Sequence, residues 1–178
     1  RFFGVALSTL AIFWTAMHRS RNILASALIR SRARGHMVVI SADGFADTMV
    51  CGTAEQGHCV VLVERGVSAE RRAEFARAGV IVIPEEASLH RWLRACSIGD
   101  AGIVICWMAS DSLSLSNAFA VRRELGGARV EIIVRLDSPE MQRSLRSAPE
   151  LLQSDEGRLR PVSPTIASVR AAFAGADL

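Results

Sequence analysis

The chain has 178 residues, half of them hydrophobic, which suits one domain of ordinary size plus an appendage. Its formal charge of +3 is uneven: residues 1–42 hold six Arg and no acid, whereas residues 43–178 hold fifteen Arg and eighteen acids. The basic character therefore belongs to the N-terminal arm. Because its arginines lack aromatic or motif context, we expect no nucleic-acid partner.

The N-terminal arm divides into two segments. Residues 1–17 are an apolar helix segment whose uncharged run falls short of the ~20 residues that span a bilayer. Residues 18–34 are basic, with apolar residues at helical spacing, and predict a linker helix that Gly35 ends. Basic residues just after an apolar segment mark the cytoplasmic side of a membrane helix. We expect either this arrangement or a soluble amphipathic helix that packs on the domain or on a partner.

Residues 35–178 alternate strand and helix patterns. Short runs rich in Val and Ile predict strands at 36–41, 58–63, 80–83, 102–107, 130–135 and 159–162. Helices are predicted at 45–56, 68–78, 88–95, 112–125, 138–147 and 164–174, and residues 147–158 are interpreted as a polar loop or an irregular helix. This alternation predicts an α/β domain, a Rossmann-like doubly wound parallel sheet of about six strands.

The first strand leads into a damaged dinucleotide fingerprint. Where G-x-G-x-x-G is expected, the chain has Ala42-Asp43-Gly44-Phe45-Ala46-Asp47, so only the second glycine remains. Gly44 leaves room for a phosphate, whereas Asp43 and Asp47 bring negative charge that would repel one. The candidate cofactor-binding residues here are Ala42, Asp43, Gly44, Phe45 and Asp47. The alternative is a Rossmann-type turn that no longer binds nucleotide.

Ligands of such a sheet lie at the carboxyl ends of its strands, so three further loops contribute candidates. Glu64 ends the second predicted strand, near the offset of about 20 residues at which an acid accepts hydrogen bonds from ribose hydroxyls. Its neighbour Arg65 would pair with Glu64 or reach a phosphate. A solvated turn residue is the alternative for Glu64. The other candidates are Glu86, Ala87, Ser88, Met108 and Asp111; Ser88 and Asp111 also suit helix caps.

Neither a metal site nor a catalytic site is expected. The four cysteines, Cys51, Cys59, Cys96 and Cys106, form no C-x-x-C pair, and the histidines are scattered, so we expect reduced, mostly buried thiols. No catalytic triad or acid–base pair emerges, which predicts a domain that is not an enzyme. A fragment of an NAD-dependent oxidoreductase is a distant alternative.

The body of the chain, from about His36 to Phe173, resembles the N-terminal lobe of RCK domains (regulators of potassium conductance), also called TrkA-N domains. The resemblance is carried by the first strand at 36–40, the Gly-His-x-Val-Val second strand at 57–65, the turn Ala78-Gly79-Val80, the run 93–101, the fifth strand at 132–135 and Pro161-Val162-Ser163-Pro164. The loop 85–88 stands where the family has Gly-Asp-Ala-Thr, a loop that lies at the adenine.

The chain departs from the family at several positions. Two fingerprint glycines are missing, and the family's D-x-x-N at the start of the fourth helix becomes Asp111-Ser112-Leu113-Ser114. These changes leave the resemblance in fold intact and bear on the ligand.

The resemblance implies a regulatory domain of a potassium channel or transporter that senses NAD(H), an adenine nucleotide (ATP, ADP or AMP) or an ion. It implies self-association as a homodimer or tetramer and a membrane-embedded pore part as partner. The domain would lie in the cytoplasm, at the cytoplasmic face of the cell membrane. The alternative is a degenerate Rossmann module that serves only assembly or partner binding.

Overall fold

The structure is a computed structural model, and it describes residues 35–41, 46–84, 89–125, 130–154 and 157–163. The predicted arm segments 1–17 and 18–34 and the predicted last helix 164–174 lie outside the described residues. In the described part, no helix is both long enough and apolar enough to cross a bilayer.

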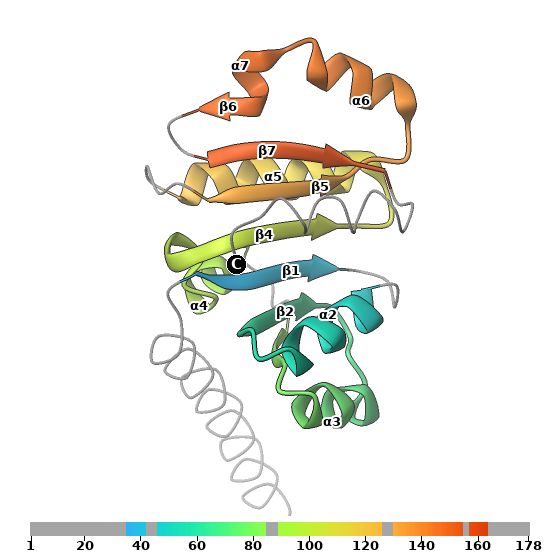
Figure 1. Cartoon of the computed structure of the whole chain (residues 1–178), viewed down its shortest axis with the longest axis vertical. Coiled ribbons are helices and arrows are strands. Elements are labelled where there is room, and N and C mark those ends of the chain that lie inside the picture. The colour runs from blue at the N-terminus through green and yellow to red at the C-terminus, as the bar shows by residue number, and fades with distance from the viewer. Residues whose placement is uncertain (1–34, 42–45, 85–88, 126–129, 155–156, 164–178) are drawn as a thin grey trace, which may run out of the picture.

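A seven-stranded sheet with the order β3-β2-β1-β4-β5-β7-β6 forms the centre of the molecule (Figure 1). Its strands are β1 (His36–Ser41), β2 (Val60–Glu64), β3 (Ile81–Pro84), β4 (Ala101–Trp107), β5 (Glu131–Arg135), β6 (Gln153–Ser154) and β7 (Gly157–Val162). All neighbouring strands are parallel except β6 and β7, which pair antiparallel. The strand order reverses between β1 and β4, as a doubly wound sheet requires.

Helices connect the strands on both faces. They are α2 (Ala46–Glu55), α3 (Ala69–Arg77), α4 (Leu89–Ala95), α5 (Asp111–Glu124), α6 (Pro139–Arg146) and α7 (Pro149–Leu152), with a 3-10 turn, η1, at Ile98–Asp100. The predicted α/β Rossmann-like fold is confirmed. The stretch 147–158, predicted as a polar loop or an irregular helix, contains the one-turn helix α7, the two-residue β6 and the start of β7; the sequence did not reveal the short strand.

Period-two alternation along the central strands builds two cores. On β1, Val38 and Ile40 face a core that includes Trp92 of α4 and Val121 of α5. Met37 and Val39 face the opposite core, which includes Val50 of α2 and Phe75 of α3. Since both faces are covered, the centres of the middle strands are apolar, and Ile103, Val104 and Ile105 of β4 are each at most 2% exposed.

Just before β1, the backbone of Gly35 packs closely against the backbone at the start of β4. The Gly35 N–H donates to the Asp100 carbonyl at 2.9 Å, and Gly35 has a φ of +84°, which favours glycine. A Cβ on Gly102 would lie 3.0 Å from the Gly35 carbonyl oxygen. The two glycines therefore let residue 35 lie against the start of β4, at the amino edge of the sheet.

Candidate functional site

Six parallel strands end side by side at the carboxyl edge of the sheet, with Pro84 of β3 next to Glu64 of β2. In register, Ser41 at the end of β1 lies beside Glu64 of β2 on one side and beside Trp107 of β4 on the other. Arg135 and Val162 end β5 and β7 in the same way. The reversal of strand order falls between β1 and β4, so this edge is where ligands of doubly wound sheets bind.

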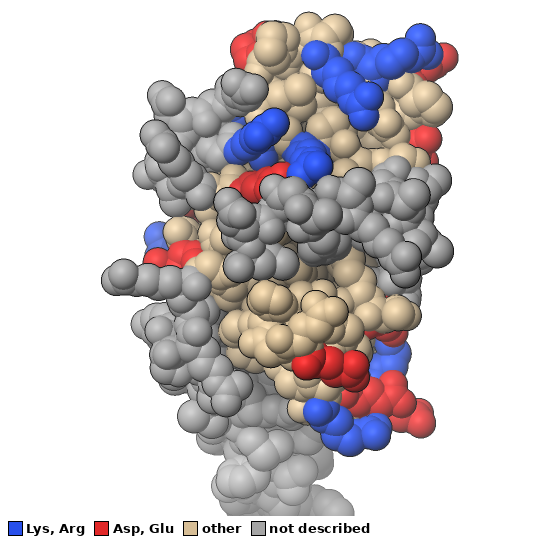
Figure 2. All heavy atoms as spheres, viewed as in Figure 1, with Lys and Arg blue, Asp and Glu red and all other residues tan. Residues whose placement is uncertain are grey.

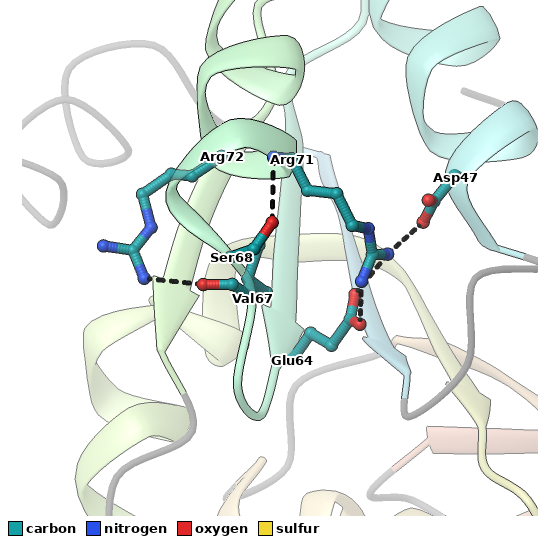
Figure 3. Close-up of polar contacts among 6 residues, drawn as sticks. All are labelled: Asp47, Glu64, Val67, Ser68, Arg71 and Arg72. Carbon is teal, nitrogen blue, oxygen red and sulfur yellow. Dashed lines mark hydrogen bonds and ion pairs between the residues drawn. The ribbon is translucent and has the colours of Figure 1, made fainter.

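Glu64 is the buried acid of this edge. Glu64 as a whole residue is 4% exposed, although it lies at the end of β2 next to a turn. A carboxylate removed from water requires hydrogen-bond donors, and both oxygens of Glu64 receive them from one guanidinium. Nη1 of Arg71 donates to Oε1 at 2.8 Å and Nη2 donates to Oε2 at 3.2 Å, a bidentate pair (Figure 3).

The same guanidinium joins Glu64 to the first turn of α2. Nη2 of Arg71 also donates to Oδ1 of Asp47 at 2.6 Å (Figure 3). The two carboxylates raise the pKa of Arg71, mainly through the hydrogen bond that Arg71 donates to Glu64 and next through the one that it donates to Asp47. Asp47, Glu64 and Arg71 therefore form one cluster, which we call the carboxylate–arginine cluster.

The base of the Arg71 side chain is fixed by the start of α3. Ser68 is the N-cap of this helix, and its Oγ accepts a hydrogen bond from the Arg71 N–H at 3.2 Å. The guanidinium lies 5.5 Å from the centroid of the Phe75 ring, one turn further along α3. Arg72 points away from the cluster, and its Nη2 donates to the Val67 carbonyl at 3.4 Å (Figure 3).

The sequence predicted negative charge from Asp47 in the first turn of α2, and the structure adds a partner for it. The Asp47 carboxylate is ion-paired with Arg71 of α3. Sequence reasoning did not identify Arg71. The available signal was an arginine three residues after a capping Ser68, which places its side chain in the first turn of the helix that follows Glu64.

The β4 side of the edge is built differently. Asp111 accepts hydrogen bonds from the Asp137 N–H at 2.7 Å (Oδ1) and from the Ser138 N–H at 2.9 Å (Oδ2). Asp111 thus holds the start of α6 against the start of α5. The N-cap of α5 is Ser110, whose Oγ accepts from the Leu113 N–H at 3.4 Å.

The Ser114 side chain meets the Met108 backbone inside the β4–α5 loop. Ser114 is fully buried. Its Oγ accepts a hydrogen bond from the Met108 N–H at 3.2 Å, which satisfies a donor at the end of β4. Arg135 lies 5.4 Å from the centroid of the Trp107 ring and pairs with Asp137 at 3.0 Å.

The described part of the chain thus brings some predicted residues together and separates others. Asp47 and Glu64 meet through Arg71, whereas Met108 and Asp111 belong to the β4–α5 loop. Arg65 follows Glu64 and is exposed. Ala42, Asp43, Gly44, Phe45, Glu86, Ala87 and Ser88 lie outside the described residues.

Cysteines and metal ligands contribute nothing further to this edge. Cys96 and Cys106 are buried, and burial raises the pKa of both thiols; Cys51 and Cys59 are partly buried, and all four are free. No group of three or more His, Cys, Asp or Glu side chains in the described ranges is arranged to hold a metal ion.

The strand order, with its reversal between β1 and β4, defines a Rossmann-type α/β fold. The family model of the TrkA-N domain matches residues 37–150, well over half of the chain, and the chain belongs to this family. The resemblance predicted from the sequence is thereby confirmed.

One solved structure supports the fold. The NAD(P)-binding domain of an exopolyphosphatase-related protein from Archaeoglobus fulgidus has a TM-score of 0.54 and 19% identity, over 79% of this chain and 96% of that one. An imine reductase from Myxococcus stipitatus in complex with NAD+ has a TM-score of 0.48 and 12% identity; 74% of this chain covers 41% of the reductase. No curated protein matches the chain.

Proposed function

We propose that this TrkA-N domain is the regulatory domain of a potassium channel or transporter and that it senses NAD(H) or an adenine nucleotide at the carboxyl edge of β1 and β2. The observation that carries the proposal is the buried Glu64 at the end of β2, beside the first turn of α2. In this fold an acid at that position accepts hydrogen bonds from the ribose hydroxyls of the nucleotide. Family membership and the NAD(P)-binding domain of the Archaeoglobus fulgidus protein support the class of ligand.

The cluster also engages the acid that replaces the third fingerprint glycine. Asp47 shares the guanidinium of Arg71 with Glu64, and the N-terminal end of α2 presents its backbone dipole to a phosphate. Gly44 remains the predicted point of phosphate approach.

Two copies of the domain would pair with each other, and the regulatory step would be a population shift between different arrangements of this pair. Ligand at the carboxyl edge favours one arrangement, and the predicted basic helix 18–34 transmits it to a membrane-embedded pore part. β1 connects the two ends of this path, because it begins where the arm enters and ends at Ser41 beside Glu64. In this proposal the domain lies at the cytoplasmic face of the membrane, pairs with itself and performs no catalysis.

Calorimetric titration with NADH, ATP and AMP tests the ligand step. We expect saturable binding of at least one of them, weakened about tenfold or more by Glu64→Gln because hydrogen bonds to a charged group are worth about 1.5–3 kcal/mol. Glu131→Gln is the matched control, since Glu131 begins β5 at the opposite edge and pairs with Arg160 at 3.2 Å. If none of the three binds at millimolar concentration, the ligand step is wrong.

A second candidate function is an assembly module that ignores nucleotides. It is favoured by Leu113 and Phe119, large apolar side chains on α5 that are 50% and 38% exposed. This candidate predicts dimers or tetramers by light scattering that are unchanged by NADH, ATP or AMP and that Phe119→Ser weakens.

A further inference from the structure

The carboxylate–arginine cluster carries an inference that rests on the proposed function and specifies how its site is controlled. Glu64 is the acid assigned to the ribose, yet both of its oxygens already bond to Arg71 at 2.8 and 3.2 Å. A guanidinium presents two parallel N–H donors to a carboxylate, the geometry that two neighbouring ribose hydroxyls would have to reproduce. We propose that Arg71 is an internal competitor of the ribose and sets the affinity and selectivity of the site.

The competition follows from the strength of the bonds. Both pairings are charge-assisted because Glu64 is ionised, but the guanidinium also carries the opposite charge and donates two parallel N–H bonds. The side chain of Glu64 is only 5% exposed, so its charge is poorly hydrated and depends on whichever donors are present. A nucleotide that engages Glu64 must therefore displace Arg71 and supply replacement donors.

Contacts that a ribose would not replace hold the Arg71 side chain beside Glu64. Asp47 binds the same guanidinium at 2.6 Å, the Phe75 ring lies 5.5 Å away, and Ser68 fixes the backbone at the start of α3. These contacts lower the entropy that Arg71 loses when it pairs with Glu64. After displacement, Arg71 remains beside Asp47, so the cluster opens at Glu64 without leaving Asp47 unpaired.

The inference predicts an unusual direction of effect. Removing a positive charge normally weakens nucleotide binding, whereas Arg71→Met should strengthen it, because Glu64 is then a buried acceptor without its partner from α3. The gain should require the ribose diol. A 2′-deoxynucleotide offers one hydroxyl less and should gain little.

The test is calorimetric titration of the wild type, Arg71→Met and Arg72→Met with NADH, ATP, AMP and 2′-deoxy-ATP. Arg72→Met is the matched control, because Arg72 is the next residue of α3 and bonds to the Val67 carbonyl instead of the cluster. We expect Arg71→Met to bind the ribonucleotides about tenfold more tightly, with at most a twofold change for 2′-deoxy-ATP. Arg72→Met should bind like the wild type.

Arg71→Lys keeps the test valid if the Met variant does not fold. Lysine retains the charge but cannot pair in bidentate fashion, so we expect an intermediate gain for the ribonucleotides. A thermal-unfolding measurement on each variant establishes folding, and ligand should raise the melting temperature of Arg71→Met more than that of the wild type.

The outcomes separate this inference from the proposed function. If the wild type binds and Arg71→Met binds equally or more weakly, or gains equally for 2′-deoxy-ATP, the competition is refuted and the proposed function stands. If only Arg71→Met binds, the competition holds and the wild type is not a nucleotide sensor. If neither protein binds, both proposals are wrong.

Discussion

Asp47 occupies the position of the third fingerprint glycine, and its carboxylate bonds to Arg71 at 2.6 Å. From the sequence, this residue is a negative charge at the phosphate end of a helix. In the structure, it is half of an ion pair and anchors the side chain that occupies Glu64. A substitution in a motif therefore has to be interpreted together with its spatial partner.

His36 is a residue whose environment makes stability depend on pH. Its Nε2 donates to the Cys96 carbonyl at 2.7 Å, and its buried Nδ1 has no hydrogen-bond partner among the described residues. A protonated ring would place a second N–H there without an acceptor. Burial accordingly lowers the pKa of His36 below 6.5, although the Cys96 carbonyl and Asp100 oppose this shift.

We predict that the His36 contribution to stability is complete above pH 6.5 and decreases as the pH falls toward the lowered native pKa. In that window the unfolded chain binds a proton that the folded chain resists, which lowers the free energy of unfolding by at most about 1.4 kcal/mol per pH unit. Urea unfolding of the wild type and His36→Gln between about pH 5 and 7.5 measures the difference. Parallel profiles of the two proteins would contradict it.

At the scale of elements, Asp111 joins α5 to α6. Asp111 accepts hydrogen bonds from the N–H groups of Asp137 and Ser138 at the start of α6, with N···O distances of 2.7 and 2.9 Å. Sequence reasoning assigned Asp111 to ligand binding or to the cap of its own helix. Its partners lie 26 and 27 residues away, and no local pattern indicates a pairing across that distance.

Asp111→Ala should lower the free energy of unfolding by about 1–3 kcal/mol, because two backbone donors lose a charged acceptor. Ser112→Ala, at the exposed neighbouring position, serves as the control and should change stability by less than about 0.5 kcal/mol. Denaturant unfolding measures both. Equal stabilities of the two variants would show that the Asp111 bonds do not contribute.

The two glycines Gly102 and Gly52 should respond to alanine in opposite directions. A methyl group on Gly102 would meet the Gly35 carbonyl oxygen at 3.0 Å, so Gly102→Ala should destabilise by about 1–3 kcal/mol. A methyl group on Gly52, inside α2, meets nothing within 4 Å, so Gly52→Ala should stabilise by up to about 1 kcal/mol. Thermal unfolding of both variants checks the signs, and destabilisation by Gly52→Ala would contradict the account of α2.

The arrangement of elements was largely predictable, whereas the site was only partly so. Parallel strands covered on both faces have continuous Val and Ile runs, and these predict β1 to β5 within one or two residues. The contacts of Arg71 were not predictable, because they depend on how α3 lies against α2 and β2. Residues 47, 64 and 71 belong to three elements, and their side chains meet only after the sheet has formed.

At the scale of the whole molecule, charge is distributed unevenly over the surface. Figure 2 shows arginines gathered over β7 and α6 and charges of both signs over α3 on the face viewed. Association through the arginines would weaken with added salt, whereas association through the exposed apolar side chains Leu113 and Phe119 of α5 would depend little on ionic strength. The salt dependence of self-association therefore distinguishes the two surfaces.

The carboxyl edge, where Glu64 lies, and the amino edge, where the N-terminal arm enters, are opposite ends of the same strand β1. The central claim is that nucleotide bound at the first edge controls potassium flux through a membrane part attached at the second. Potassium flux into proteoliposomes containing the channel or transporter that carries this domain tests the claim directly. We predict that the nucleotide bound in calorimetry changes the flux of the wild type and leaves that of Glu64→Gln unchanged. Equal wild-type flux with and without a nucleotide that demonstrably binds would contradict the claim.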